Sequence, residues 1–151
     1  MSTFRFALGR VLSWRETELA VAEAALERLR SELQARRSQL ADLLSNEVKE
    51  LELIQFARSL RGGDLAGIAR TRTWVAQEKQ RLQAQIAECI NRIESQTAIL
   101  MEARRKVRLL ERLRERRHAA WLHEENRVLE ELAGESALGK WRREENRDTN
   151  A

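Results

Sequence analysis

Large apolar residues return at every seventh position over long stretches of the chain, with mostly polar and charged residues between them. On a helix this spacing places the apolar side chains on one side, where they can form the contact seam of a coiled coil. Each half of the chain holds one such row, so the pattern predicts two long helices, at about residues 4–60 and 64–133. The first row is Leu12, Leu19, Leu26, Leu33 and Leu40, and the second is Ile86, Ile93, Leu100 and Val107.

The two rows are mirror images about Gly63. The position numbers of Leu26 and Leu100 add up to 126, as do those of the other apolar pairs, and half of 126 is 63. If the chain turns back at Gly62 and Gly63, the two rows face each other. The predicted fold is all-α: two long helices in an antiparallel coiled-coil hairpin, with the turn near Gly62-Gly63. A shift of a few residues at the turn is compatible with both rows, and separate long helices that dimerise are the alternative.

The mirror rule also pairs the layers between these rows, and it suggests how the second helix starts. Asp64 is a candidate cap for this helix, because a carboxylate can accept hydrogen bonds from the first free backbone N–H groups. Thr71 and Thr73 are alternative starts that lengthen the turn. The paired layers are Leu29/Thr97, Ala22/Arg104, Arg36/Ile90 and Arg15/Glu111.

The second helix is longer than the first, so its last part has no partner within the hairpin. Under the mirror rule facing positions add up to 126, so no residue of the first helix faces position 126 or those after it. Gly134 and Gly139 weaken the helix further along. We therefore expect a single hairpin over residues 1–133 and a polar, flexible tail over residues 134–151. The same rule places Trp121 near Phe4 and Phe6.

The composition agrees with long helices and a narrow apolar seam. Charged residues make up 34% of the 151 residues, and the chain contains no proline. Proline inside a helix costs roughly 3 kcal/mol, so its absence favours uninterrupted helices. Cys89 is the single cysteine, which excludes an internal disulfide and fits a reducing compartment. No apolar run approaches the roughly 18 residues that a membrane span needs.

The sequence contains no convincing arrangement for catalysis or for binding a metal or cofactor. The stretch "GGDLAG", Gly62 to Gly67, has the glycine spacing of a phosphate-binding loop, but Ile68 and Ala69 stand where that loop needs Lys and Ser/Thr. His118 and His123 are five residues apart and fall on different helix faces, so we interpret them as surface histidines. We predict a non-enzyme with no catalytic residues, cofactor or metal.

The strongest chemical signal is a basic run in the second helix. "RRKVRLLERLRERR", residues 104–117, has eight basic and two acidic residues, whereas the whole chain has a net charge of +4. Several of its arginines share one face of the helix, away from the seam. A solvated helix face, an acidic protein groove and nucleic acid are the candidate interpretations. Nucleic acid is the weaker one, because the sequence holds no recognition motif and no aromatic residue on the basic arc.

Each end of the chain carries a distinctive stretch: "FRFALGRVLSWRETE", residues 4–18, and "RRKVRLLERLRERRHAAWLHEENRVLEELA", residues 104–133. The first, with its aromatic-basic-aromatic start and later Arg-Glu, resembles the opening of the FliJ family of the bacterial flagellar export apparatus. The second resembles the closing helix of that family. The middle is similar only as a coiled coil, and YscO-type injectisome stalk proteins resemble the chain as well.

The resemblance implies a stalk that links several export components. FliJ proteins are antiparallel hairpins whose terminal end enters the ring of the export ATPase, while the middle and tip contact the export gate and substrate-specific chaperones. Such a protein is cytoplasmic and lies at the inner-membrane export apparatus through its partners only. The implied ATPase contacts are Phe4, Arg5, Phe6, Arg112, Arg116 and Arg117. For the export gate we expect contacts from Val48, Leu51, Gln55, Phe56 and Trp74.

Two alternatives come from other functional classes. A basic coiled coil could bind nucleic acid or ribosomes through residues 104–117, although we expect no nucleic-acid partner. The chain could also be a structural coiled-coil scaffold with no role in export.

Overall fold

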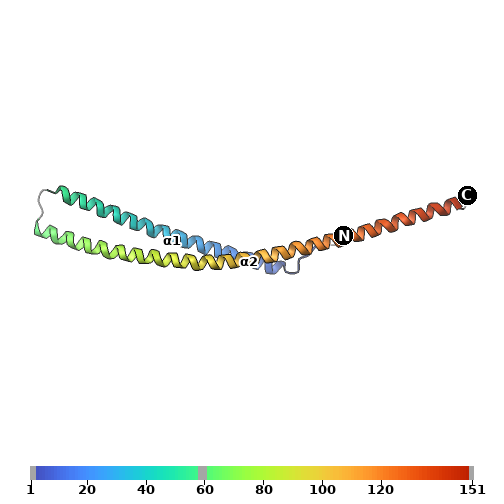
Figure 1. The fold of residues 1–151 in the computed structure, drawn as a ribbon, viewed down its shortest axis with the longest axis horizontal. Coiled ribbons are helices and arrows are strands. Elements are labelled where there is room, and N and C mark those ends of the chain that lie inside the picture. Colours follow the sequence, from blue (N-terminus) through green and yellow to red (C-terminus); the bar gives the residue numbers. More distant parts are fainter. Residues whose placement is uncertain (1–2, 58–60, 150–151) are drawn as a thin grey trace. The chain divides into compact units, whose positions relative to one another are not determined.

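The protein consists of two long α-helices in the computed structural model, which describes residues 3–57 and 61–149. Helix α1 spans Gly9–Phe56 and helix α2 spans Gly62–Thr149 (Figure 1). The described residues form no β-strand, and the predicted all-α fold of two long packed helices is confirmed. The chain divides into two compact units. We call Thr17–Arg104 the hairpin unit, and Met1–Glu16 with Arg105–Ala151 the terminal unit, and describe each by itself.

Helix α1 begins later than the heptad pattern predicted. We expected a start near residue 4, but residues 3–6 are not helical, and the backbone N–H of Gly9 donates to the carbonyl oxygen of Phe6 at 3.0 Å. The first helical bond follows from Leu12 N–H to the Leu8 carbonyl at 2.9 Å. The non-helical start leaves Phe4 and Phe6 to contact helix α2, as described below.

The connection between the helices lies just before the glycine pair, and the two glycines belong to the first turn of α2. The backbone N–H of Arg61 donates to Asp64 Oδ2 at 3.1 Å, while the Asp64 N–H donates to the Arg61 carbonyl at 3.0 Å. Asp64 thus stabilises the helix start from its third position, as the acidic residue of a capping box does. No described glycine has a positive φ, so Gly62 and Gly63 are not needed for a left-handed turn. Residues 58–60, predicted to end the first helix, lie outside the described residues.

Near the middle of the two helices, and far from the turn, the hairpin unit holds a buried apolar cluster. Ala22, Leu26 and Leu100 form a buried cluster, with Leu19 and Ile93 packed against it. Leu26 and Leu100 are 74 positions apart in the sequence, so their contact requires the chain to fold back. Burying a leucine side chain contributes about 1.5–3 kcal/mol, which makes this cluster a main source of stability.

Polar contacts border this cluster and join the same two helices. The Gln96 side-chain amide donates to the Ala22 carbonyl oxygen at 3.2 Å. Arg104 Nη2 lies 3.5 Å from Glu23 Oε1, an exposed ion pair of small net value. Arg104 therefore pairs with Glu23 at the edge of the seam and does not form a core layer with Ala22. The mirror rule was wrong for this layer.

The second core row of α2 differs from the one that the mirror rule gave. Cys89 is 3% exposed, whereas Ile90, which we had placed in a layer with Arg36, is 36% exposed. A heptad allows a second core row either three or four residues after the first. The mirror rule selected the row four residues after Ile86, at Ile90, whereas the buried row lies three residues after it, at Cys89. The buried residues of the true row are Val75, Leu82 and Cys89.

Helix α2 of the terminal unit continues beyond the end that we predicted at residue 133. Residues 134–149, expected in a polar tail, are helical. The side chain of Arg143 donates to the Gly139 carbonyl at 3.0 Å, one helical turn back. Glu and Arg dominate this segment and are good helix formers, so two glycines at about 1 kcal/mol each do not end the helix. The flexibility of this segment stays a prediction.

No helix among the described residues is both long and apolar enough to cross a membrane.

Candidate functional site

An aromatic cluster joins the N-terminal segment to α2 within the terminal unit. The ring centroids of Phe4 and His118 lie 4.9 Å apart in an edge-to-face arrangement. Phe4 and Trp121 lie 5.9 Å apart, and His118 stacks on Trp121 at 5.8 Å. These distances fall in the range in which aromatic pairs attract each other. The predicted proximity of Trp121 to Phe4 is confirmed, and we call Phe4, His118 and Trp121 the aromatic cluster.

Phe6 contacts an arginine of α2, and its proximity to Trp121 stays a prediction. Its ring lies 5.9 Å from the guanidinium carbon of Arg117, which is a cation–π distance. In the same unit, the guanidinium of Arg15 lies 4.5 Å from the Trp14 ring centroid. The positions of Leu12 and Arg114 also add up to 126, so the mirror rule places the two opposite each other. Arg114 is exposed and lines a hollow of about 460 Å³ together with Leu12 and Phe6. Arginine and aromatic side chains thus meet repeatedly in this unit.

His118 is a member of the cluster that the sequence analysis missed. It was interpreted as a surface histidine, and its residue is indeed exposed. Its position three before Trp121 places both side chains on the same helix face, which was the available signal. The attraction to Phe4 could not be seen from spacing within α2 alone.

An exposed row of arginines runs along α2 in the terminal unit. Arg105, Arg108, Arg112 and Arg116 follow one another at steps of three or four residues and are all exposed. Such steps keep the side chains on one helix face. Arg5 and Arg117 are exposed as well. We call Arg105, Arg108, Arg112 and Arg116 the arginine row. Their planar, permanently charged guanidinium groups can form paired hydrogen bonds with carboxylates.

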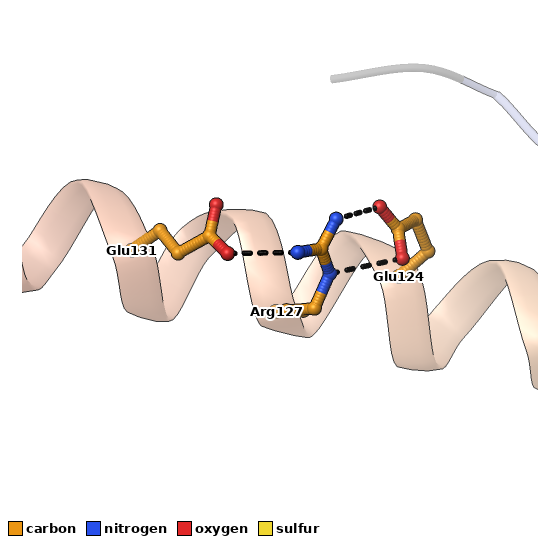
Figure 2. A network of polar contacts seen from close by, with 3 residues as sticks. All are labelled: Glu124, Arg127 and Glu131. Atoms are coloured by element: carbon orange, nitrogen blue, oxygen red, sulfur yellow. Dashed lines mark hydrogen bonds and ion pairs between the residues drawn. The ribbon is translucent and has the colours of Figure 1, made fainter.

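Further along α2, charged side chains stabilise the helix itself. The Arg127 guanidinium bridges Glu124 and Glu131, one helical turn away on either side (Figure 2). The Nη1 atom of Arg127 lies 2.8 Å from Glu131 Oε1. Hydrogen bonding to Arg127 lowers the pKa of Glu124 below its ordinary value. These pairs favour helix formation beyond the aromatic cluster.

A second surface lies at the turn end of the hairpin unit. There a groove of about 470 Å³ opens between the helices, and Figure 1 shows α1 and α2 spreading apart toward the turn. We call it the turn groove. Its apolar walls include Leu51, Leu53 and Ile54 from α1 and Ile68 from α2, while Gly63 and Gly67 leave space on the α2 side.

The residues predicted to contact an export gate are exposed around this end. Phe56 is 83% exposed and Trp74 58% exposed, with Val48 and Gln55 exposed as well. Leu51 is less exposed and also lines the turn groove. Large apolar side chains exposed together are typical of protein-binding surfaces.

These features define the chain as a coiled-coil hairpin whose exposed surfaces are suited to binding other proteins. Among the described residues, no group of His, Cys, Asp and Glu side chains could hold a metal ion.

The family model described as Flagellar FliJ protein matches residues 4–146. The chain belongs to this family, and it is accordingly a component of the flagellar export apparatus, from a family that is not catalytic. No curated protein and no solved structure matches the chain.

Proposed function

We propose that the chain is the stalk and chaperone-escort component of the flagellar type III export apparatus, with its terminal unit inserted into the ring of the export ATPase. Membership of the FliJ family supports the setting. The observation that carries the ATPase contact is the exposed arginine row next to the aromatic cluster. Arginine pairs well with carboxylates, so an acidic ring lining is the expected counterpart. The proposed contacts are Phe4, Arg5, Phe6, Arg112, Arg116 and Arg117.

The turn end is proposed to contact the export gate and the substrate-specific chaperones. The exposure of Phe56 and Trp74 supports this assignment, because burying large aromatic side chains is a main source of binding energy at interfaces. Val48, Leu51 and Gln55 complete the proposed surface. The protein would then be cytoplasmic and held at the inner membrane through its partners only.

The ATPase contact is tested with the purified export ATPase from the same genome. The wild-type chain should bind it, promote ring assembly and raise the rate of ATP hydrolysis. Arg112→Glu combined with Arg116→Glu should weaken binding by at least about tenfold, because like charges would then face each other. Arg30→Glu combined with Arg37→Glu is the matched control, since both residues are exposed arginines of the hairpin unit.

Equal losses of affinity for the ATPase in both double variants would show that net charge, and not the arginine row, governs binding. A wild-type chain that neither binds the ATPase nor changes hydrolysis would remove the stalk proposal. Added RNA should not displace the ATPase; displacement that weakens steeply with salt would favour the nucleic-acid alternative.

The gate contact is tested with the cytoplasmic part of the export gate protein. Phe56→Ala combined with Trp74→Ala should lower its affinity for the chain by about tenfold or more, since buried aromatic anchors are each worth over 1 kcal/mol. Val21→Ala combined with Ile99→Ala removes comparably exposed apolar side chains elsewhere in the hairpin unit and should leave affinity unchanged. Unchanged affinity in the first pair would locate the gate contact elsewhere.

A further inference from the structure

At the turn groove, the side chains of the hairpin unit do not fill the space between α1 and α2. Gly63 and Gly67 are four residues apart and lie on one face of α2, which lines the groove. A Cβ atom added at either glycine would meet no atom within 4 Å beyond the adjoining residues and backbone of its own helix. Leu53 in the opposite wall is 72% exposed. Apolar surface is therefore left open in a position where ordinary side chains would close it.

The charge at the groove is opposite to that of the chain as a whole. Among the described residues that line it, Glu47, Glu50 and Asp64 stand with a single basic residue, Arg72. The chain carries a net charge of +4. A local excess of carboxylates around an apolar floor selects a partner with apolar side chains flanked by basic ones.

We infer that the turn groove is a docking site for a basic amphipathic helix of a partner protein, whose apolar side chains fill the space beside Gly63 and Gly67. Two neighbouring helices form a groove that accepts a third helix by interlocking side chains. The missing side chains at the glycines let the incoming helix approach the α2 backbone closely. Lysine or arginine on the flanks of that helix would reach Glu47, Glu50 and Asp64.

This inference deepens the proposed contact at the turn end and rests on it for the partner's identity. The chemistry of the groove can be tested without that partner. The probe is a synthetic helical peptide with leucines at positions i, i+4, i+7 and i+11 and lysines on both flanks. A second peptide has the same leucines and glutamates in place of the lysines.

The lysine peptide should bind the full chain, and the glutamate peptide should bind at least about tenfold more weakly. Non-specific attraction to a basic chain would give the opposite order, because the chain has a net charge of +4. Gly67→Leu should abolish binding of the lysine peptide by filling the groove. It should also raise the thermal midpoint by roughly 2–4 °C, since glycine weakens a helix interior.

Gly134→Leu is the matched control, because it makes the same replacement in α2 outside the groove and also meets no atom within 4 Å. It should bind the lysine peptide as the wild type does. The inference is overturned if the lysine peptide does not bind, if it binds Gly67→Leu equally well, or if both peptides bind alike. A wild-type dimer in sedimentation that Gly67→Leu dissociates would also overturn it, by showing that a second copy occupies the groove.

The export gate protein, measured with the same variants, separates this inference from the proposed function. Failure of the gate protein to bind the wild-type chain would refute the proposed gate contact, while the peptide result would still decide the chemistry of the groove. If Gly67→Leu keeps gate binding but loses the peptide, the groove inference is supported and its occupant is not the gate.

Discussion

The part of the hairpin unit near the middle of the two helices, which we call the middle, and the turn end are built from the same two helices but packed differently. In the middle, Leu26 is 4% exposed and lies in a cluster with Ala22 and Leu100. At the turn end, Leu53 is 72% exposed and borders a groove of about 470 Å³. Toward the turn, the seven-residue rows continue into the charged residues Glu47, Lys79 and Arg72, which cannot close the seam as leucines do. Stability is therefore concentrated in the middle, and binding surface is left at the end.

The largest expected difference comes from removing a leucine side chain in each region. Leu26→Ala should lower the free energy of unfolding by about 2–4 kcal/mol, because it removes buried contacts and leaves a cavity. Leu53→Ala should change it by less than about 0.5 kcal/mol, since its side chain is mostly in solvent. Urea unfolding followed by circular dichroism measures both values. Similar losses would contradict the contrast between the two regions.

Adding a side chain tests whether the middle has any free space. Ala22→Leu should cost about 1–3 kcal/mol, because Ala22 is buried between the helices and the cluster has to move. Ala24→Leu is the control, since Ala24 is exposed on the same helix. Its free energy of unfolding should stay close to that of the wild type. A neutral Ala22→Leu variant would mean that the middle is as loosely packed as the turn end.

Adding a side chain at the turn end should stabilise the protein, whereas in the middle it should destabilise it. Gly67→Ala should raise the free energy of unfolding by about 0.5–1 kcal/mol, since alanine favours the helix and its methyl group meets no atom within 4 Å. Thermal unfolding provides the measurement. A clear loss of stability would show that the space beside Gly67 is occupied in the isolated protein.

The smallest expected effect concerns the charged pairs on α2. Hydrogen bonding to Arg127 lowers the pKa of Glu124 in the folded chain. The ionised carboxylate therefore stabilises the helix at pH values above the pKa of an unfolded glutamate, about 4.3. This contribution is lost as the pH falls through the lowered pKa of the folded chain. Arg127→Gln should move the pKa of Glu124 back toward its ordinary value, as an NMR titration would show. An unchanged pKa would mean that the bridge of Figure 2 does not persist in solution.

Much of the fold could be predicted because repeating apolar residues carry information about helix faces. The spacing of Leu26 and Leu100 predicted that the chain folds back, and the mirror rule brought Trp121 to Phe4. The rule failed for the layers between the rows, because a heptad allows a second core row either three or four residues after the first, and Cys89 and Ile90 are both apolar. It selected Ile90 and missed Cys89.

Other features depend on contacts that no single-helix pattern contains. His118 joined the aromatic cluster only because the non-helical start of the chain brings Phe4 to it. The turn groove depends on how side chains from both helices fill the space between them, and Gly62 and Gly63 predicted a turn without indicating a gap. The helical continuation to Thr149 was missed because two glycines were given more weight than the helix formers around them.

Amide hydrogen exchange of the full-length chain tests the central contrast most directly. Backbone N–H groups of residues 19–33 and 86–103 should exchange slowly, because opening them requires separating the packed cluster. Those of residues 47–56 and 62–74, at the turn end, should exchange at least about tenfold faster, since few buried contacts protect them. Uniform protection along both helices up to the turn would contradict a closed middle and an open end.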